Sequence, residues 1–246
     1  MPKVDDCLKM RKGLYFTKMD LKNGFWQIPL KKEDQAKTTF IIGEKYYQWK
    51  VMPMGMKNSP MTFQALIDKT LTGILGEYVY GYIDDIIVFS ETWEDHMKHL
   101  AEVLKRLQKA NLRVSIQKCE WATKSVRFLG HVFSHREIKI DPEKVQAVDL
   151  LPYPEYKTPA ENIKAVQKFL GMTGFCRRYI INYARIAKPL NSLLKAGIEW
   201  QFGKEQKEAW DKLKKAPQTS PVLKQADPDK FGKMGIYTHW HTSPDH

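Results

Sequence analysis

The run Val79-Tyr-Gly-Tyr-Ile-Asp-Asp-Ile-Ile-Val-Phe-Ser90 places two adjacent aspartates, Asp84 and Asp85, inside an apolar stretch of β-branched and aromatic residues. Such residues favour buried strands. A carboxylate in these surroundings needs a partner or a metal ion, because burying an unpaired charge is costly. We therefore expect a hairpin of Val79–Ile83 and Ile86–Ser90 with both acids at its tip. Two fixed negative charges there suit Mg²⁺, and the alternative is an ordinary tight turn that happens to use Asp-Asp.

The composition is typical of a folded intracellular protein. A chain of 246 residues, 43% hydrophobic and 12% aromatic, suffices for one large domain or two small ones. No apolar run approaches about 20 residues and the first residues lack a signal peptide's apolar core, so we expect no membrane span. Three widely spaced cysteines, Cys7, Cys119 and Cys176, indicate reduced thiols rather than a disulfide set or a zinc site.

The positive charge is concentrated in two segments. The formal net charge is +12, and residues 98–139 contain ten Lys/Arg and three acids. Residues 163–195 contain seven Lys/Arg and no acid. Solvated faces usually mix charges of both signs, so this clustering favours a polyanionic partner such as nucleic acid. The alternative is a generally basic protein with a local excess arising by chance.

Hydrophobic patterns predict strands early in the chain and helices later. The expected strands are Tyr15–Asp20, Trp26–Leu30, Lys37–Ile42, Tyr46–Met52, Val126–Gly130 and His131–Ser134. A helix is expected from Ser59-Pro60 to Gly76, because Ser is a good N-cap and Pro a good first residue. Its inner face is Phe63, Leu66, Ile67, Leu71, Ile74 and Leu75.

A second helix is expected after Thr92-Trp-Glu-Asp95, which resembles a capping box. Its expected inner face is Met97, Leu100, Leu104 and Leu107. His96 and His99 are three residues apart there and could bind a metal, but without a third ligand nearby a solvated helix face is the better interpretation.

Four prolines between residues 142 and 159 mark the change to helices. The expected helices are Ala160–Met172, Phe175–Asn182, Tyr183–Lys195 and Lys204–Lys215. The chain is thus predicted to be a mixed α+β domain to about residue 140, followed by a basic helical one and a weaker unit from about residue 200.

Asp20 is the best third acid for a metal pair, which needs rigid carboxylates from separate elements. It ends the apolar strand Leu14-Tyr-Phe-Thr-Lys-Met19. The alternative role is turn or helix capping.

Five ordered motifs resemble those of reverse transcriptases. Asp20-Leu-Lys-Asn-Gly-Phe-Trp-Gln-Ile28, Met52-Pro-Met-Gly-Met-Lys-Asn-Ser-Pro60 and Tyr82-Ile-Asp-Asp85 resemble motifs A, B and C. Phe128-Leu-Gly-His131 resembles motif E, the primer grip. Lys168-Phe-Leu-Gly-Met-Thr-Gly-Phe-Cys-Arg-Arg-Tyr-Ile180, Ala187-Lys-Pro-Leu190 and Leu193-Leu-Lys195 resemble the thumb of gypsy-type retrotransposon and errantivirus Pol proteins.

The resemblance implies an α+β polymerase palm, an antiparallel sheet with helices on one face. Residues 1–140 would be this palm with residual fingers, residues 141–198 a helical thumb, and residues 199–246 a connection and truncated start of an RNase H-like region. Most of the fingers would be missing. His239 stands near where the RNase H metal-binding aspartate would be expected.

The resemblance also implies an RNA-directed DNA polymerase that extends a primer 3′-hydroxyl with two Mg²⁺ ions, for which Mn²⁺ would substitute. Asp20 and Asp84 would hold the metals, Asp85 would complete the acidic tip, and the Leu21 carbonyl would add an oxygen. Lys118 would protonate pyrophosphate.

The remaining roles concern the nucleotide and the template–primer. Phe25 would be the steric gate against a 2′-hydroxyl, with a plain core aromatic as the alternative, and Gly55 would allow close approach of the nucleotide. Met54 stands where many retroviral relatives have glutamine, so no hydrogen-bonding role is expected there. The residues expected to contact the template–primer backbone are Lys168, Arg177, Arg178 and Lys188.

The expected partners are an RNA or DNA template–primer, dNTPs and the rest of a Pol polyprotein, with its fingers, RNase H and integrase. The expected location is the cytoplasm or a virus-like particle. Because the fingers are incomplete, the alternative function is a catalytically inactive retrotransposon remnant that only binds nucleic acid.

Overall fold

A four-stranded antiparallel sheet in the order β4-β5-β1-β6 carries the acidic hairpin. Its strands are β4 (Val79–Tyr82), β5 (Asp85–Ser90), β1 (Tyr15–Asp20) and β6 (Glu120–Thr123). The computed structural model describes residues 13–135, 137–155, 157–195, 197, 200–217 and 223–224. Within them the architecture is mixed α+β with antiparallel sheets, as predicted.

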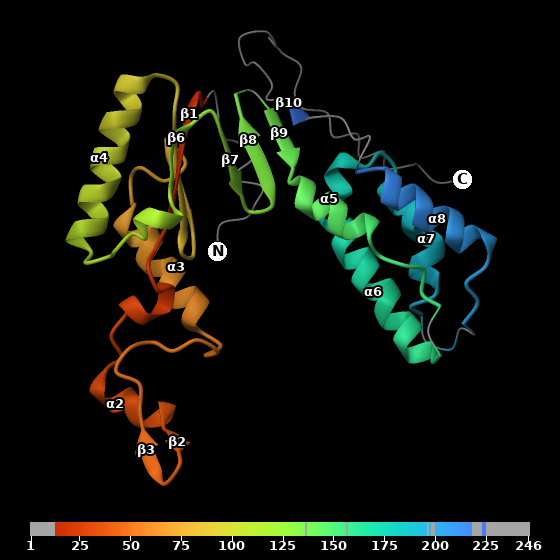
Figure 1. The fold of residues 1–246 in the computed structure, drawn as a ribbon, viewed down its shortest axis with the longest axis horizontal. Helices are drawn as coiled ribbons and strands as arrows, with labels where there is room; N and C mark the ends of the chain where they lie inside the picture. Colours follow the sequence, from red (N-terminus) through yellow and green to blue (C-terminus); the bar gives the residue numbers. More distant parts are fainter. Residues whose placement is uncertain are drawn as a thin grey trace, which may run out of the picture.

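Helices α3 (Ser59–Thr70) and α4 (Trp93–Lys109) cover one face of this sheet. Met19, Ile86 and Val88 of the strands join one core cluster with helix residues such as Phe63, Ile67, Val103 and Leu107. Thr92 is the N-cap of α4, because its Oγ1 accepts a hydrogen bond from the Asp95 N–H at 3.1 Å. Figure 1 shows α4 beside the sheet, on the side away from β7 (Ser125–Phe128) and β8 (His131–Ser134).

A second antiparallel sheet in the order β10-β9-β8-β7 faces the other side of the first one. It adds β9 (Glu137–Ile140) and β10 (Leu223–Lys224) to β7 and β8. Phe16 and Ile87 of the first sheet pack with Phe128 and Phe133 of the second. Because side chains alternate along a strand, Lys18 and Asp20 lie on the same face of β1 as Phe16.

The later helices form a separate unit with its own core (Figure 1). They are α5 (Pro142–Asp149), α6 (Pro159–Phe175), α7 (Tyr183–Ser192) and α8 (Lys204–Lys215), with the 3₁₀ turn η4 (Arg177–Tyr179). Trp210 stacks on Phe169 with ring centroids 3.6 Å apart, and both side chains are buried.

A small hairpin projects from the first unit (Figure 1). It is made of β2 (Phe40–Ile42) and β3 (Lys45–Tyr47), preceded by η1 (Gly24–Gln27), α2 (Lys32–Gln35) and η2 (Ala36–Thr38). All six strand residues are exposed. A row of touching rings follows it, Trp26 on Trp49, Trp49 on Phe40 and Phe40 on Tyr47.

Several predicted elements are confirmed and several are wrong. The strand Tyr15–Asp20 and the helix Lys204–Lys215 are confirmed as predicted, and the helix from Ser59 ends earlier, at Thr70. Trp26–Leu30 is not a strand, because its first residues belong to the 3₁₀ turn η1. Phe175–Asn182 is likewise not an α-helix but ends α6 and continues into η4. The predicted strands Lys37–Ile42 and Tyr46–Met52 are shorter in the structure, as β2 (Phe40–Ile42) and β3 (Lys45–Tyr47). The elements that sequence patterns missed are α2, β6, β9, α5, β10, η2 and the 3₁₀ turn Ile116–Lys118.

The expected inner face of α4 is only partly confirmed, since Leu107 is buried and Leu100 packs against the core. Its buried residues are His96, Val103 and Leu107, whereas Met97 and Leu104 are 37% and 36% exposed. His96 is therefore a core residue rather than part of a solvated face.

Within the described residues, no helix has both the length and the apolar character needed to cross a lipid bilayer. Among those same residues, there is likewise no group of three or more His, Cys, Asp or Glu side chains placed to hold a metal ion. The residues around His239 lie outside the described part of the chain.

Candidate active site

Strand register brings the predicted acids together. In the antiparallel pairing of β1 with β5, Asp20 stands directly opposite Asp85. The backbone N–H of Leu21 donates to the Asp84 carbonyl at 2.8 Å, which ties the end of β1 to the hairpin. The two strands are far apart in sequence, so this convergence depends on the sheet itself.

The hairpin tip differs from the prediction in one respect. Tyr82 pairs with Asp85, so only Ile83 and Asp84 form the turn and Asp85 is already part of β5. Two-residue loops are the commonest hairpin connections, because their backbone matches the twist of the strands. Asp84 is therefore at the tip as expected, whereas Asp85 lies on the sheet beside Asp20.

The turn contains a strained residue. Ile83 has φ +53°, a region that β-branched residues rarely adopt. Such a conformation costs on the order of 1–3 kcal/mol and persists only where the surroundings impose it.

Gln64 of α3 supplies this constraint. Its Oε1 accepts from the Ile83 N–H at 2.8 Å. Its Nε2 donates to the Gly81 carbonyl at 3.1 Å and to Asp68 Oδ1 at 2.8 Å. The side chain is 2% exposed, so one buried amide fixes the hairpin tip to the helix layer.

Two lysines accompany the acids. Lys18 Nζ lies 3.3 Å from Asp85 Oδ1, and Lys118 Nζ lies 3.8 Å from Asp20 Oδ1. Lys118 ends the 3₁₀ turn η3 (Ile116–Lys118), which is held to β1 by the Ser115 N–H donating to the Asp20 carbonyl at 2.8 Å. The structure thus brings Lys118 to the acids, as its predicted role requires.

The electrostatics of Asp85 reflect both burial and charge. Burial raises the pKa of Asp85 above its usual value, Lys18 opposes this rise, and the charges of Asp84 and Asp20 add to it. Lys18 is therefore the charge that opposes the effect of burial on this carboxyl.

The chemistry of the donor set suits Mg²⁺, which prefers carboxylate and carbonyl oxygens. Asp20, Asp84 and Asp85 lie at adjoining positions of one sheet edge. The Leu21 carbonyl accepts a hydrogen bond from the Gly24 N–H at 3.3 Å, which leaves one lone pair. The residues fit a divalent cation in type and backbone position, although their side chains do not form a preassembled three-acid cluster.

Of the residues predicted to face the nucleotide, Phe25 packs on the core and Met54 and Gly55 are open to solvent. Phe25 packs edge-on against Phe63 of α3 with ring centroids 5.7 Å apart. Met54 is 65% exposed, and Gly55 has φ +87° with open space around it. Gly24, at φ +41°, lies so close that an added Cβ would be 3.7 Å from Asp84 Oδ2.

The predicted grip Phe128–His131 forms the β7–β8 turn and lies against the helical unit. Gly130 has φ +76°, and a Cβ added there would be 2.7 Å from the Phe175 ring. The His131 ring lies 5.2 Å from that of Phe175 and 5.9 Å from that of Tyr179. This turn is therefore a contact between the second sheet, which packs on the acid-bearing sheet, and the end of α6.

The predicted backbone-contacting cations lie on the helical unit. Lys168 on α6, Arg177 in η4 and Lys188 on α7 are exposed. The side chain of Arg178 lies outside the described residues. Their exposure leaves these cations accessible to a polyanion.

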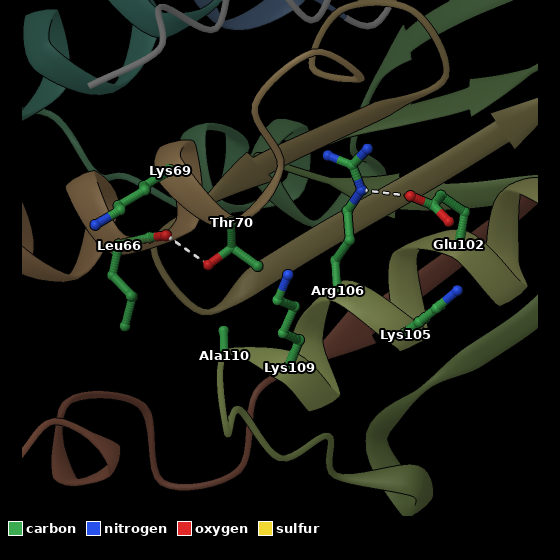
Figure 2. A pocket seen from close by; sticks show the side chains of 8 residues that line it. All are labelled: Leu66, Lys69, Thr70, Glu102, Lys105, Arg106, Lys109 and Ala110. Carbon is green, nitrogen blue, oxygen red and sulfur yellow. Dashed lines mark hydrogen bonds and ion pairs between the residues drawn. The ribbon is translucent and has the colours of Figure 1, made fainter.

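A pocket of about 630 Å³ lies between α3 and α4 rather than at the acids (Figure 2). Its cations are Lys69, Lys105, Arg106 and Lys109. Arg106 donates to Glu102 Oε1 and to the Thr72 carbonyl, both at 2.6 Å. Cations at the C-terminal turns of two helices offset the helix dipoles, which explains the charge of this pocket without a ligand.

Two residues of the site were missed by sequence patterns, Lys18 and Gln64. Lys18 lies two residues before Asp20, and Gln64 lies four residues after Pro60. Lys18 shares a strand face with Asp20, a signal that alternation in β1 offered. Gln64 gave no signal, because its partners come from a separate hairpin.

Comparison with known proteins agrees with this geometry. Residues 2–133 match the family described as reverse transcriptase (RNA-dependent DNA polymerase). The chain is 38% identical over 232 residues to the retrovirus-related Pol polyprotein from transposon 297 of Drosophila melanogaster, covering 94% of this chain and 21% of that protein. It is 43% identical over 179 residues to the Pol polyprotein from transposon opus of the same organism, covering 73% and 17%. The chain thus spans about a fifth of the length of these curated relatives.

Two solved structures are similar in fold. The foamy viral protease-reverse transcriptase dRH in complex with ds DNA superposes with a TM-score of 0.79 at 30% identity, covering 89% of this chain and 38% of that one. The foamy viral protease-reverse transcriptase in complex with an RNA/DNA hybrid gives a TM-score of 0.78 at 28% identity, covering 92% and 30%.

Proposed function

Because the chain belongs to the reverse transcriptase (RNA-dependent DNA polymerase) family, we propose that it is the polymerase segment of a longer retrotransposon Pol polyprotein and adds deoxynucleotides to a primer 3′-hydroxyl. The observation that carries this proposal is the register of Asp20 opposite Asp85, with Asp84 next to it at the hairpin turn. Relatives about five times longer than the chain support the polyprotein origin.

Asp20 and Asp84 would hold Mg²⁺ or Mn²⁺ through their carboxylates, with Asp85 completing the acidic edge and the Leu21 carbonyl as a further oxygen. Such an ion, when bound, offsets the negative charge that develops on the attacking and leaving oxygens. Lys118, 3.8 Å from Asp20, would hold the proton that pyrophosphate takes on leaving. The Phe25 ring would exclude a 2′-hydroxyl.

The partners of this activity would be dNTPs and an RNA or DNA template–primer. Similar solved chains were seen with ds DNA and with an RNA/DNA hybrid. Phe128, Leu129, Gly130 and His131 would grip the primer, and Lys168, Arg177, Arg178 and Lys188 would contact the phosphate backbone.

We assign residues 1–140 to a palm with residual fingers, residues 141–198 to a thumb, and residues 199–246 to a connection and RNase H-like start. The transition from β9, which ends at Ile140, to α5, which begins at Pro142, supports the first of these boundaries. The proposed location is intracellular, in the cytoplasm or a virus-like particle.

The test is dNTP incorporation on an RNA template with a DNA primer, in Mg²⁺ or Mn²⁺. Asp84→Asn should reduce incorporation about a hundredfold or more, because the cation that offsets the negative charge on the attacking and leaving oxygens would lose a carboxylate ligand. Primer–template affinity should stay within about twofold, since phosphate contacts come from other residues.

Asp34→Asn is the matched control, because Asp34 pairs with Lys37 on the surface of the projecting unit. Equal incorporation by the Asp84→Asn and Asp34→Asn variants would contradict the metal-ligand assignment.

A second function, binding of nucleic acid without catalysis, is favoured by the net charge of +12 and by the exposed cations Lys168, Arg177 and Lys188, which require no metal. That reading requires salt-sensitive affinity for template–primer and no incorporation in either metal.

A further inference from the structure

Lys18 holds an unusual position among the acids. It precedes Asp20 by two residues on β1, so both side chains lie on the same face of the sheet. In the β1–β5 pairing Lys18 stands opposite Ile87, which makes it the diagonal neighbour of Asp85. Its Nζ lies 3.3 Å from Asp85 Oδ1, and the two side chains are 23% and 29% exposed.

The three carboxylates at the end of β1 and β5 differ in how closely a lysine pairs with them. Lys18 is held within the sheet beside Asp85, whereas Lys118 lies on a turn and its side chain is 70% exposed. Over the described stretches of the chain, the structure shows no ion pair for Asp84. Of the three carboxylates, Asp85 is therefore the one with a fixed, partly buried counter-ion.

We infer that Lys18 is a positioning residue that keeps Asp85 as its ion-pair partner, so that Asp20 and Asp84 receive the divalent cation. This inference rests on the proposed function for the cation itself. The ion pair fixes the Asp85 carboxylate against β1 and cancels one of the three negative charges.

A charge argument gives the direction of the effect. Removal of the Lys18 ammonium leaves Asp85 uncompensated, and the site then attracts a cation more strongly. A unit charge about 7 Å from a divalent ion in a water-like medium changes its affinity by roughly five- to tenfold. Lys18 therefore makes metal binding weaker than the three acids alone would.

The experiment measures Mn²⁺ binding to the purified chain by electron paramagnetic resonance, without nucleotide or template. We expect Lys18→Met to bind Mn²⁺ about five- to tenfold more tightly than the parent chain. Lys18→Arg, which keeps the charge, should restore the parent affinity. Unchanged or weaker Mn²⁺ binding by Lys18→Met would overturn the inference.

Two comparisons locate the effect at Lys18. Lys22→Met removes an equal charge two residues on the other side of Asp20, and screening should keep its effect below about twofold. In the Asp85→Asn background Lys18→Met should still tighten Mn²⁺ binding, because the ammonium acts on the cation through space whether or not residue 85 is charged. Loss of the effect in that background would contradict the charge argument.

A readout without metal separates this inference from the proposed function. If Asp84→Asn binds Mn²⁺ as well as the parent, the metal assignment fails but the Lys18–Asp85 pair is still decided by thermal unfolding. Lys18→Met and Asp85→Asn should each lower Tm. The double variant should lower Tm by less than the sum of the two single decreases, because neither charge is then left unpaired. Additive shifts would overturn the pairing.

Discussion

At the residue scale, Gln64 is the side chain on which the acidic turn depends most directly. It satisfies the Ile83 N–H and the Gly81 carbonyl, which belong to the strained tip and to β4. A buried donor or acceptor left without its partner costs about 1–3 kcal/mol. Gln64 thus offsets the strain at Ile83 with hydrogen bonds from another element.

Gln64→Met keeps the volume of the side chain and removes its hydrogen bonds. We expect the free energy of unfolding in urea to fall by about 2–4 kcal/mol, and incorporation to fall because Asp84 loses its fixed position. Gln48→Met, at an exposed position of the projecting unit, should change stability by less than about 0.5 kcal/mol. Equal stabilities of the two variants would exclude the bracing role of Gln64.

Individual site residues could be predicted from the sequence where a charged side chain stands in an apolar segment. Asp84 and Asp20 stood out because carboxylates interrupt or end apolar strands, and the structure brings both to one sheet edge. Asp85 was expected at the tip, but a two-residue turn suffices and places it on β5. Lys18 and Gln64 are ordinary polar residues in sequence, and only the fold supplies their partners.

At the element scale, α4 shows why hydrophobic period alone assigned an inner face that is only half correct. The pattern favoured Met97 and Leu104, because His96 counts as polar. In the structure His96 is fully buried, with Nε2 2.8 Å from Thr17 Oγ1 and Nδ1 3.0 Å from Ser90 Oγ. Partners on β1 and β5 satisfy the imidazole, so the helix can turn this residue inward.

The His96 environment predicts a pH-dependent stability. Burial lowers the pKa of His96 below its usual 6.5, and the neighbouring His99 adds to the effect. The unfolded chain then binds more protons between the folded pKa and 6.5, so stability is complete above pH 6.5 and is lost as pH falls below it. We expect urea unfolding to show a loss of at most about 1.4 kcal/mol per pH unit from this histidine.

His96→Gln should flatten this dependence between pH 7.5 and pH 5.5, because it removes the titrating group. His99, whose pKa burial also lowers, contributes in the same direction, so His99→Gln is the matched comparison. An unaltered pH dependence in the His96→Gln variant would show that His96 is not the group responsible.

Other elements were missed for local reasons. The 3₁₀ turn η1 begins at Gly24 after Asn23, both at positive φ, so the chain reverses where a strand was expected. The strand β6 has no alternation of buried and exposed residues, and β9 alternates but is only four residues long. Long periodic elements such as α8, and the apolar strand β1, were predicted with correct bounds.

At the scale of the whole molecule, the acids and the exposed cations belong to different units that meet at the β7–β8 turn. The first unit carries the acidic edge, and the α5–α8 unit carries Lys168, Arg177 and Lys188. The contacts of His131 with Phe175 and Tyr179 join the two. The net charge of +12 attracts polyanions to the chain as a whole. The junction at the β7–β8 turn fixes the position of the exposed cations relative to the acids, and so where a bound nucleic-acid strand would lie.

Template–primer affinity should therefore fall steeply with salt, through counter-ion release. Lys168→Gln and Lys188→Gln should each weaken binding equally for unrelated sequences and reduce the slope of log K against log salt by about 1. Fluorescence anisotropy at several salt concentrations measures both effects. Lys204→Gln, an exposed lysine at the start of α8, is the control, and an equal slope change in it would argue against a specific phosphate track.

The separation of the tryptophans gives the two ends of the chain distinct optical signals. Trp26, 43% exposed, stacks on Trp49 beside the projecting hairpin. Trp210, 1% exposed, lies on Phe169 inside the helical unit. An aqueous quencher reaches the first indole and not the second. The chain has seven tryptophans, and Trp93 and Trp121 are also exposed. A molecule that covers the hairpin therefore changes only the part of the emission that comes from Trp26 and Trp49, whereas melting of the helical core exposes Trp210.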